Sequence, residues 1–243
     1  MAIATMADII TAARVKTNTL GSGYFDDSVE MPIYVNFAVS DVYDRVVAAY
    51  DQYFAKHAPF TLTTSNEISL PDIIDPGSEN PQSDFYKELG VDYWPNGNAL
   101  TALTVMPIGS YLERNFGNAW GGAGIYGPVR MYNIIGDTLQ ILPASANYAG
   151  KYVLHYVPNA PIMTVVDDLP VELVRWVKLI TLKVAKTMKE KREQPTDEIT
   201  AAIAQQERRI DEMAHHRIKE GKRIPIRNVN VMGWSGNNGF GGF

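Results

Sequence analysis

Two adjacent aspartate pairs are the first residues whose types could support acid–base chemistry. They are Asp26-Asp27 and Asp167-Asp168. A general acid and a general base must both reach one reacting group, and the side chains of neighbouring residues rarely converge in that way. The second pair also precedes Pro170, an arrangement of charge and backbone that favours the start of a helix. We therefore interpret both pairs as structural.

A histidine pair towards the C-terminus has part of the spacing of a metal site. Asp211 lies one helical turn before His215, and His216 follows, so an Asp/His pair could contribute two ligands. No third ligand stands at a suitable spacing, and the neighbouring Arg208 and Arg209 would repel a cation. Solvated or interface histidines are the better interpretation.

The span 122–127 matches the G-x-G-x-x-G pattern of dinucleotide-binding loops. That pattern needs a strand before it and a helix after it, whereas Pro128 and a strand-like run follow here, which favours a loop. The chain contains no G-x-S-x-G elbow, Walker loop or H-E-x-x-H motif. It also has no cysteine, which excludes disulfides, thiolate zinc sites and cysteine nucleophiles. We expect no enzymatic activity, no cofactor and no metal.

The composition indicates a folded globular protein. The 243 residues are 46% hydrophobic and 20% charged, which is ordinary for such proteins. The net charge of -5 does not favour a nucleic-acid-binding domain, although it would suit a surface that DNA passes without sticking. The sequence shows no signal-peptide pattern and no apolar run of about 18 residues. We expect a cytoplasmic origin and no membrane contact.

Helical periodicity marks both ends of the chain. Thr5 and Asp8 form a capping-box pattern at the first helix. Pro170 starts a long helix that we expect to continue without a break, and Pro195-Thr-Asp ends it and starts the last helix, so that the two form an antiparallel hairpin. The first expected helix ends at about Val15, and the second runs from about Phe37 to Lys56. The long helix ends at about Gln194, and the last helix ends at about Lys219.

Between residues 57 and 166 prolines and glycines become frequent, and the apolar pattern shifts to period two, which is typical of strands. Gly136-Asp137 indicates a tight hairpin turn, and Asn96-Gly97 is a second turn signal. The glycine-rich stretch 117–127 indicates a loop tip. The expected strands are Phe60–Thr64, Ala99–Met106, Val129–Ile135, Thr138–Leu142 and Lys151–Val157.

Basic residues mark the long helix. Arg175, Lys178, Lys186 and Lys189 are expected mostly on one face, and basic residues crowd the C-terminal half, where they complement the helix dipole. A solvated face explains this pattern. Contact with an acidic neighbouring subunit, or with phosphates, stays open, although no aromatic residues interleave as a stacking platform would require.

The C-terminal segment combines glycine with large aromatic side chains, namely Trp234, Phe240 and Phe243. A segment this rich in glycine cannot form its own core, and exposed aromatic side chains reduce solubility unless they insert elsewhere. We expect these three residues to dock on a partner protein, with a disordered tail as the alternative.

The order of these elements resembles the head-tail connector, or adaptor, proteins of tailed bacteriophages. In that family a short helix and a second helix precede a variable middle region. A strand pair then follows with a residue pattern like that of Tyr132-Asn-Ile-Ile-Gly-Asp-Thr-Leu-Gln-Ile-Leu-Pro143. A further strand, similar to Tyr152-x-Leu-x-Tyr-Val-Pro158, precedes the helical hairpin. The loop 117–127 and the long glycine/aromatic tail depart from the family pattern.

The resemblance implies an α+β fold: a helical bundle with a long C-terminal hairpin, an inserted antiparallel β region and an extended tail. The corresponding segments are 1–56 for the N-terminal helices, 57–166 for the β region, 167–222 for the hairpin and 223–243 for the tail.

The resemblance also implies a virion structural protein, assembled in the host cytoplasm, that forms a dodecameric homo-oligomeric ring below the portal. Its partners would be the portal protein, tail or stopper/nozzle proteins and the passing DNA. The tail residues would dock on the portal. Arg175, Lys178, Arg208 and Arg209 are candidates for the subunit interface, where neighbouring subunits could also cover the apolar stripe of the hairpin. A DNA-binding packaging protein and another neck component, such as a stopper or tail terminator, remain alternatives.

Overall fold

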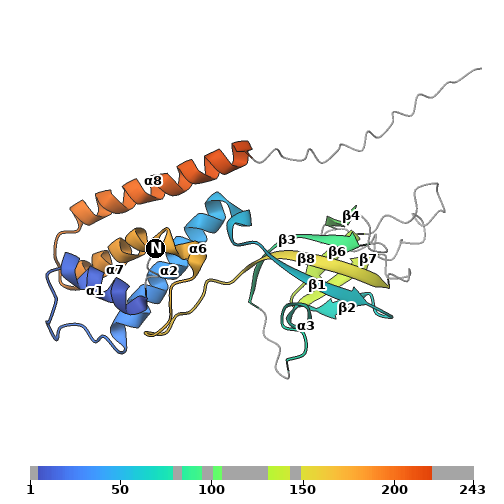
Figure 1. Cartoon of the computed structure of the whole chain (residues 1–243), viewed down its shortest axis with the longest axis horizontal. Helices are drawn as coiled ribbons and strands as arrows, with labels where there is room; N and C mark the ends of the chain where they lie inside the picture. Colours follow the sequence, from blue (N-terminus) through green and yellow to red (C-terminus); the bar gives the residue numbers. More distant parts are fainter. Residues whose placement is uncertain (1–4, 79–83, 95–100, 106–130, 143–148, 221–243) are drawn as a thin grey trace, which may run out of the picture.

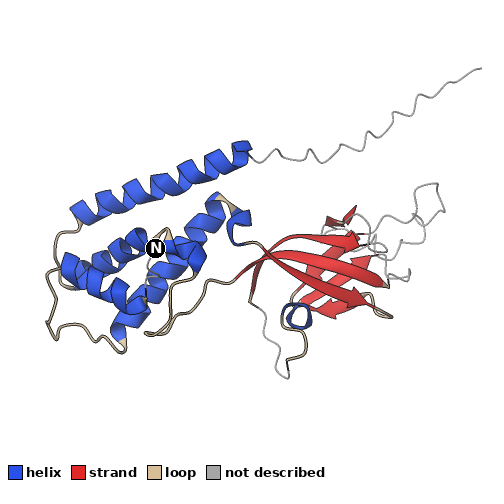
Figure 2. Ribbon diagram, in the orientation of Figure 1, coloured by secondary structure: helices blue, strands red, loops and turns tan. Residues whose placement is uncertain are grey.

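The computed structural model describes residues 5–78, 84–94, 101–105, 131–142 and 149–220. Within them the protein has a mixed α+β fold, with a group of helices on one side and two small sheets on the other (Figure 1). Figure 2 shows that helix and strand barely mix, apart from one short helix beside the sheets. No helix in the described ranges is long and apolar enough to cross a membrane.

The helical module comprises elements from both ends of the chain. Its members are α1 (Met6–Lys16), α2 (Glu30–Ala49), the 3-10 helix η1 (Asp51–Phe54), α6 (Val171–Val174), α7 (Val177–Lys191) and α8 (Asp197–Glu220). Helix α7 contacts α1, α2 and α8, and α7 and α8 run in opposite directions (Figure 1).

The capping box predicted for the first helix is confirmed. The Asp8 amide donates to the Thr5 hydroxyl at 3.1 Å, and the Thr5 amide donates to the Asp8 carboxylate at 2.9 Å. Thr5 is also tied to the C-terminal half of the chain, because its backbone forms an isolated bridge with Asp168. The start of α1 is therefore fixed both locally and across the module.

Two helix predictions were wrong in their extent. Helix α2 starts at Glu30 rather than Phe37 and ends before Lys56, which lies in a strand. The backbone carbonyl of Asp26 accepts the amides of Glu30 and Met31 at 3.1 and 2.9 Å, which nucleates the helix earlier. Pro32 is tolerated because the first helical turn needs no intrahelical N–H bond.

The long helix expected from Pro170 to Gln194 is broken at Arg175 and Trp176. There the Trp176 amide donates to the Leu173 carbonyl at 2.8 Å, a three-residue step that tightens the turn. Trp176 is 4% exposed, so this turn places the indole in the core. Helix α7 then ends at Lys191, and Glu193 adopts a positive φ of 54° beyond it.

Each sheet has three strands and a two-residue strand at one edge. The first has the order β1 (Lys56–Leu62), β8 (Gly150–Pro158), β3 (Phe85–Trp94), β4 (Thr101–Ala102) and is antiparallel throughout. The second has the order β2 (Glu67–Ser69), β7 (Thr138–Leu142), β6 (Met131–Ile135), β5 (Thr104–Val105), and only β5 pairs in parallel. The short α3 (Leu70–Ile74) follows β2.

The strand predictions had mixed outcomes. The hairpin at Gly136-Asp137 is confirmed, since Ile135 pairs with Thr138 and Gly136 has a φ of 57°. The strand expected over Ala99–Met106 is present only as β4 and β5 in its described part, interrupted at Leu103. Strand β3 was missed altogether. The Asn96-Gly97 turn and the loop 117–127 lie outside the described residues.

The apolar side chains form two separate cores, one in the helical module and one between the sheets. The apolar stripe of α7 is fully covered inside the helical module: Leu179, Ile180, Val184 and Met188 are each 0% exposed. Neighbouring subunits, which the sequence analysis offered as a possible cover for the stripe, are therefore not needed to bury these four side chains. Helices α1 and α2, which the sequence argument did not place against the stripe, cover it.

We expect Leu179→Ala to lower the free energy of unfolding by about 2–5 kcal/mol, because it removes a fully buried side chain and leaves a cavity in the core of the helical module. Leu20→Ala is the matched control, since Leu20 is 66% exposed and its truncation should change stability by about 0.5 kcal/mol or less. Chemical denaturation measures both. Equal losses in the two variants would contradict the assigned core.

Candidate functional site

Lys183 connects three helices through ion pairs. Its ammonium lies 2.5 Å from the Asp41 carboxylate of α2 and 3.0 Å from the Glu207 carboxylate of α8. Desolvation lowers the pKa of Lys183, but hydrogen bonds to Asp41 and Glu207 outweigh it, and the net pKa is raised above the ordinary value. The lysine therefore stays charged and holds α2, α7 and α8 in register.

Other lysines of α7 also find acidic partners within the same chain. Lys186 pairs with Glu190 at 3.5 Å, and Lys191 pairs with Glu30 at the start of α2. The hydrogen bond from Lys191, reinforced by one from Tyr34, holds the pKa of Glu30 below its usual value. Of the four basic residues expected on one face of this helix, only Lys186 forms an ion pair with another described residue. Three lysines of α7, namely Lys183, Lys186 and Lys191, are thus engaged by carboxylates within the chain.

The four candidate interface residues are all exposed. Arg175 lies at the break before α7, with its guanidinium 5.5 Å from the centre of the Trp176 ring, and Lys178 lies in the first turn of α7. Arg208 and Arg209 lie on α8, where Arg209 donates to the Gln206 side chain at 3.1 Å. Among the described residues, Arg175, Lys178 and Arg208 form no ion pair.

The first aspartate pair has a structural role at the loop between α1 and α2. Arg14 is buried, and its guanidinium donates to Asp27 at 2.6 and 2.9 Å. It also donates to the carbonyls of Thr19, Ser22 and Phe25 at 3.1, 3.0 and 2.8 Å. One arginine thereby orders the whole loop. The sequence did not indicate this role of Arg14, because an arginine in the last turn of a helix is usually explained by its favourable interaction with the helix dipole.

The remaining acidic candidates are also engaged. Asp26 accepts from the hydroxyl and amide of Ser28, both at 2.7 Å, and these bonds lower its pKa. Asp167 accepts from the Thr164 amide at 2.6 Å, and its pKa is likewise lowered by hydrogen bonds from Thr164. These contacts leave the aspartate pairs in turns rather than facing a common substrate position.

The partial metal spacing on α8 is also used differently. The Asp211 carboxylate accepts two bonds from the Arg45 guanidinium, at 2.7 and 2.8 Å, so it links α8 to α2. In the described ranges no group of three potential ligands could hold a metal ion. Of the two residues at the i, i+4 spacing, Asp211 is thus used in a contact between helices.

The first sheet carries a row of polar side chains that no local sequence pattern predicted. His57 in β1 and His155 in β8 face each other with their Nδ1 atoms 2.6 Å apart, and His155 Nε2 lies 2.9 Å from the Asp92 carboxylate in β3. These residues are 35 or more positions apart in sequence, and only the strand register brings them together. The side chains of His57, His155 and Asp92 thus connect three adjacent strands on one face of the sheet.

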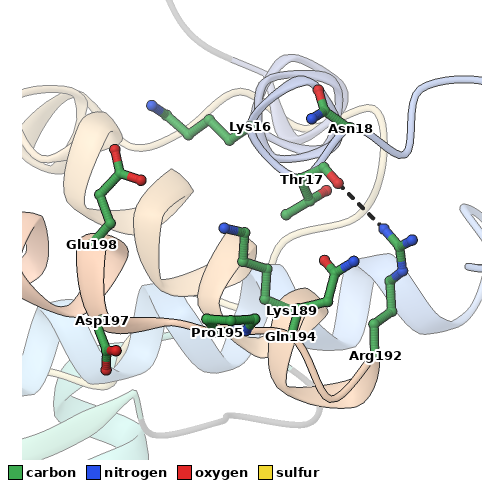
Figure 3. A pocket seen from close by; sticks show the side chains of 9 residues that line it. All are labelled: Lys16, Thr17, Asn18, Lys189, Arg192, Gln194, Pro195, Asp197 and Glu198. Atoms are coloured by element: carbon green, nitrogen blue, oxygen red, sulfur yellow. Dashed lines mark hydrogen bonds between the residues drawn. The ribbon is translucent and has the colours of Figure 1, made fainter.

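An open recess with a cavity volume of about 530 Å³ lies where α1 ends and α7 turns into α8 (Figure 3). In it the Arg192 guanidinium donates to the Thr17 carbonyl at 3.3 Å. The lining carries Lys16 and Lys189 but also Asp197 and Glu198, so charges of both signs meet there. A mixed surface of this kind suits contact with another protein better than capture of a single anion.

The glycine-rich span 122–127 and the tail residues Trp234, Phe240 and Phe243 lie outside the described residues. Their roles accordingly stay predictions. The described helices and sheets provide two packed cores, charged outer faces and open recesses such as the one beside Arg192.

A comparison with protein-family models matches residues 4–227 to the SU10 adaptor protein model. The chain belongs to the SU10 adaptor family. This family of phage adaptor proteins agrees with the resemblance to head-tail connectors inferred from the order of elements. A search of curated proteins found no significant match. The match to the adaptor family covers both described modules but ends before the three aromatic residues of the tail.

We expect Lys183→Met to destabilise the protein by about 1–2 kcal/mol, because it removes charge-assisted hydrogen bonds that connect α2, α7 and α8. The loss is no larger because Asp41 is largely exposed, and solvent weakens its ion pair with Lys183. Lys178→Met, in the same helix but exposed, should change stability by about 0.5 kcal/mol or less. Thermal unfolding followed by circular dichroism would measure the difference. Indistinguishable variants would show that the ion pairs contribute nothing to stability.

Proposed function

We propose that this chain is a structural head-to-tail adaptor of a tailed-phage virion. In this proposal it forms a dodecameric ring below the portal, links the capsid to the tail and lines the channel through which DNA passes. The observation that carries the proposal is the adaptor-family match, which spans both the helices and the sheets. The protein would act by geometry and contact, in the neck of the virion, after assembly in the host cytoplasm.

The distribution of exposed apolar side chains supports an assembly role. More than half of those that the structure describes lie in segments 1–56 and 167–222, including Leu20, Phe37 and Val171, which are each 66% exposed or more. Apolar side chains that the module's own core does not cover are typical of surfaces that meet other proteins. The helical module is thus a natural candidate for the ring-forming part.

We further propose a division of labour along the chain. Segments 1–56 and 167–222 build the ring, segment 57–166 contacts tail or stopper/nozzle proteins, and segment 223–243 docks on the portal. Trp234, Phe240 and Phe243 would be the anchors in that last contact. Large aromatic side chains on a glycine-rich segment suit insertion into grooves of a partner, where burial offsets the entropy lost on ordering.

A DNA-binding packaging protein is less well supported. Lys183, Lys186 and Lys191, which lie in the most basic part of α7, have carboxylate partners within the chain. Phosphates would have to compete with these partners for the lysines. The net charge of -5 also disfavours strong attachment to DNA and suits a channel through which DNA slides.

Deleting residues 230–243 should weaken attachment to the portal while leaving the helical module and the sheets folded. The reason is that the deletion removes the three aromatic anchors but no residue of the two cores. The mass of the purified protein, measured with and without portal protein, tests this. A full-length variant with all three aromatics changed to alanine separates the loss of anchors from the loss of length. If both variants bind the portal as tightly as the full chain, the docking role of the tail is wrong.

A further inference from the structure

The outward face of α2 carries large apolar side chains that its own module does not cover. Ile33 and Phe37 are 47% and 70% exposed and lie four residues apart, so they share one face of the helix. Asp44, seven residues after Phe37, lies on the same face about two turns further, is exposed and forms no ion pair with any described residue. We call Ile33, Phe37 and Asp44 the α2 stripe.

The α2 stripe does not lie against the module's own α8. Asp41 and Arg45, which lie further round α2, face the other helices instead: Asp41 pairs with Lys183 of α7, and Arg45 pairs with Asp211 of α8. On another side of α2, Asn36 binds the backbone of Met163, donating to its carbonyl at 3.0 Å and accepting from its amide at 2.9 Å. The stripe lies between these two contacts and faces away from the core.

The outward face of α8 has the complementary character. Ala201, Ala204 and Arg208 are exposed on it, and Arg208 forms no ion pair with any described residue. Ala201 and Arg208 are seven residues apart, the same offset as Phe37 and Asp44. Small side chains allow another helix to approach closely, which large apolar side chains on that helix can exploit. We call Ala201, Ala204 and Arg208 the α8 stripe.

We propose that the α2 stripe of one copy packs against the α8 stripe of the next copy around the ring. Ile33 and Phe37 would cover the two alanines, and Asp44 would pair with Arg208. The partner is thus a second copy of this chain, joined through two different faces, as a closed ring of many subunits requires. The inference rests on the proposed ring and names its interface.

The directions of α2 and α8 give an independent reason for aligning the two stripes in this way. Within one copy α2 and α8 run in the same direction, because Asp41 lies near Glu207 and Arg45 pairs with Asp211 further along. Neighbours in a many-membered ring differ by a small rotation, so α8 of the next copy keeps nearly the same direction relative to α2. The alignment of Phe37 with Ala201 and Asp44 with Arg208 is parallel, as that geometry demands.

Charge reversal tests the proposal on the full chain. Asp44→Arg and Arg208→Asp should each raise the concentration needed for ring formation about tenfold or more, because like charges would then meet at every interface. The double variant restores opposite charges and should recover assembly. Asp75→Arg, an exposed aspartate beyond α3, is the matched control and should assemble normally. Native mass spectrometry, with portal protein present to seed the ring, gives the readout.

Cysteine crosslinking provides a second measurement that does not depend on changing charges. The chain has no native cysteine, so Phe37→Cys and Ala201→Cys single variants can be mixed and joined with a short bismaleimide. We expect covalent dimers between the two variants, and none when Ala12→Cys on α1 replaces Ala201→Cys. Circular dichroism checks that every variant is folded.

The outcomes separate the interface from the ring itself. If the wild-type protein forms rings but the single charge reversals assemble equally well and no crosslink forms, the interface is wrong and the ring stands. If the wild-type protein stays monomeric even with the portal, both the ring and this interface are overturned. Loss in the single variants with recovery in the double variant supports the proposed contact.

Discussion

The burial of α7 constrains everything else in the helical module. Its apolar side chains are covered on different sides by α1, α2 and α8, and these helices come from opposite ends of the chain. The two ends must therefore meet, and the residues between them must leave the module and return. Strand β1 begins soon after η1, and β8 ends where the segment leading to α6 begins, so the sheets emerge from the helical module at one place (Figure 1).

Ionic contacts fix the register that apolar burial leaves free. Lys183 and the Arg45–Asp211 pair set how α2, α7 and α8 slide along one another, while Arg14 holds the loop that returns from α1 to α2. At the junction with the sheets, the Tyr43 hydroxyl donates to the Pro158 carbonyl at 2.5 Å, and Val157 of β8 joins the helical core. These contacts couple the sheets to the helices.

Local signals in the sequence predicted the elements that depend on local physics. The capping box at Thr5 and the turn at Gly136 followed from local residue types and spacing alone. Strand β3 was missed because its burial does not alternate cleanly and register shifts interrupt its pairing with β8. The break at Trp176 depends on where a distant core can accept an indole. The Lys183 and Arg14 contacts likewise depend on tertiary packing that no local pattern records.

The resemblance to adaptor proteins came from the order of elements rather than from any single residue, and the family-model match over residues 4–227 shows the membership. The most direct test of the account is an electron cryomicroscopy reconstruction of the neck of assembled virions. The account predicts a ring of density between portal and tail into which the helical module fits with α2 of one copy beside α8 of the next. Density for this chain in the capsid shell, the tail tube or the interior of the head would contradict it.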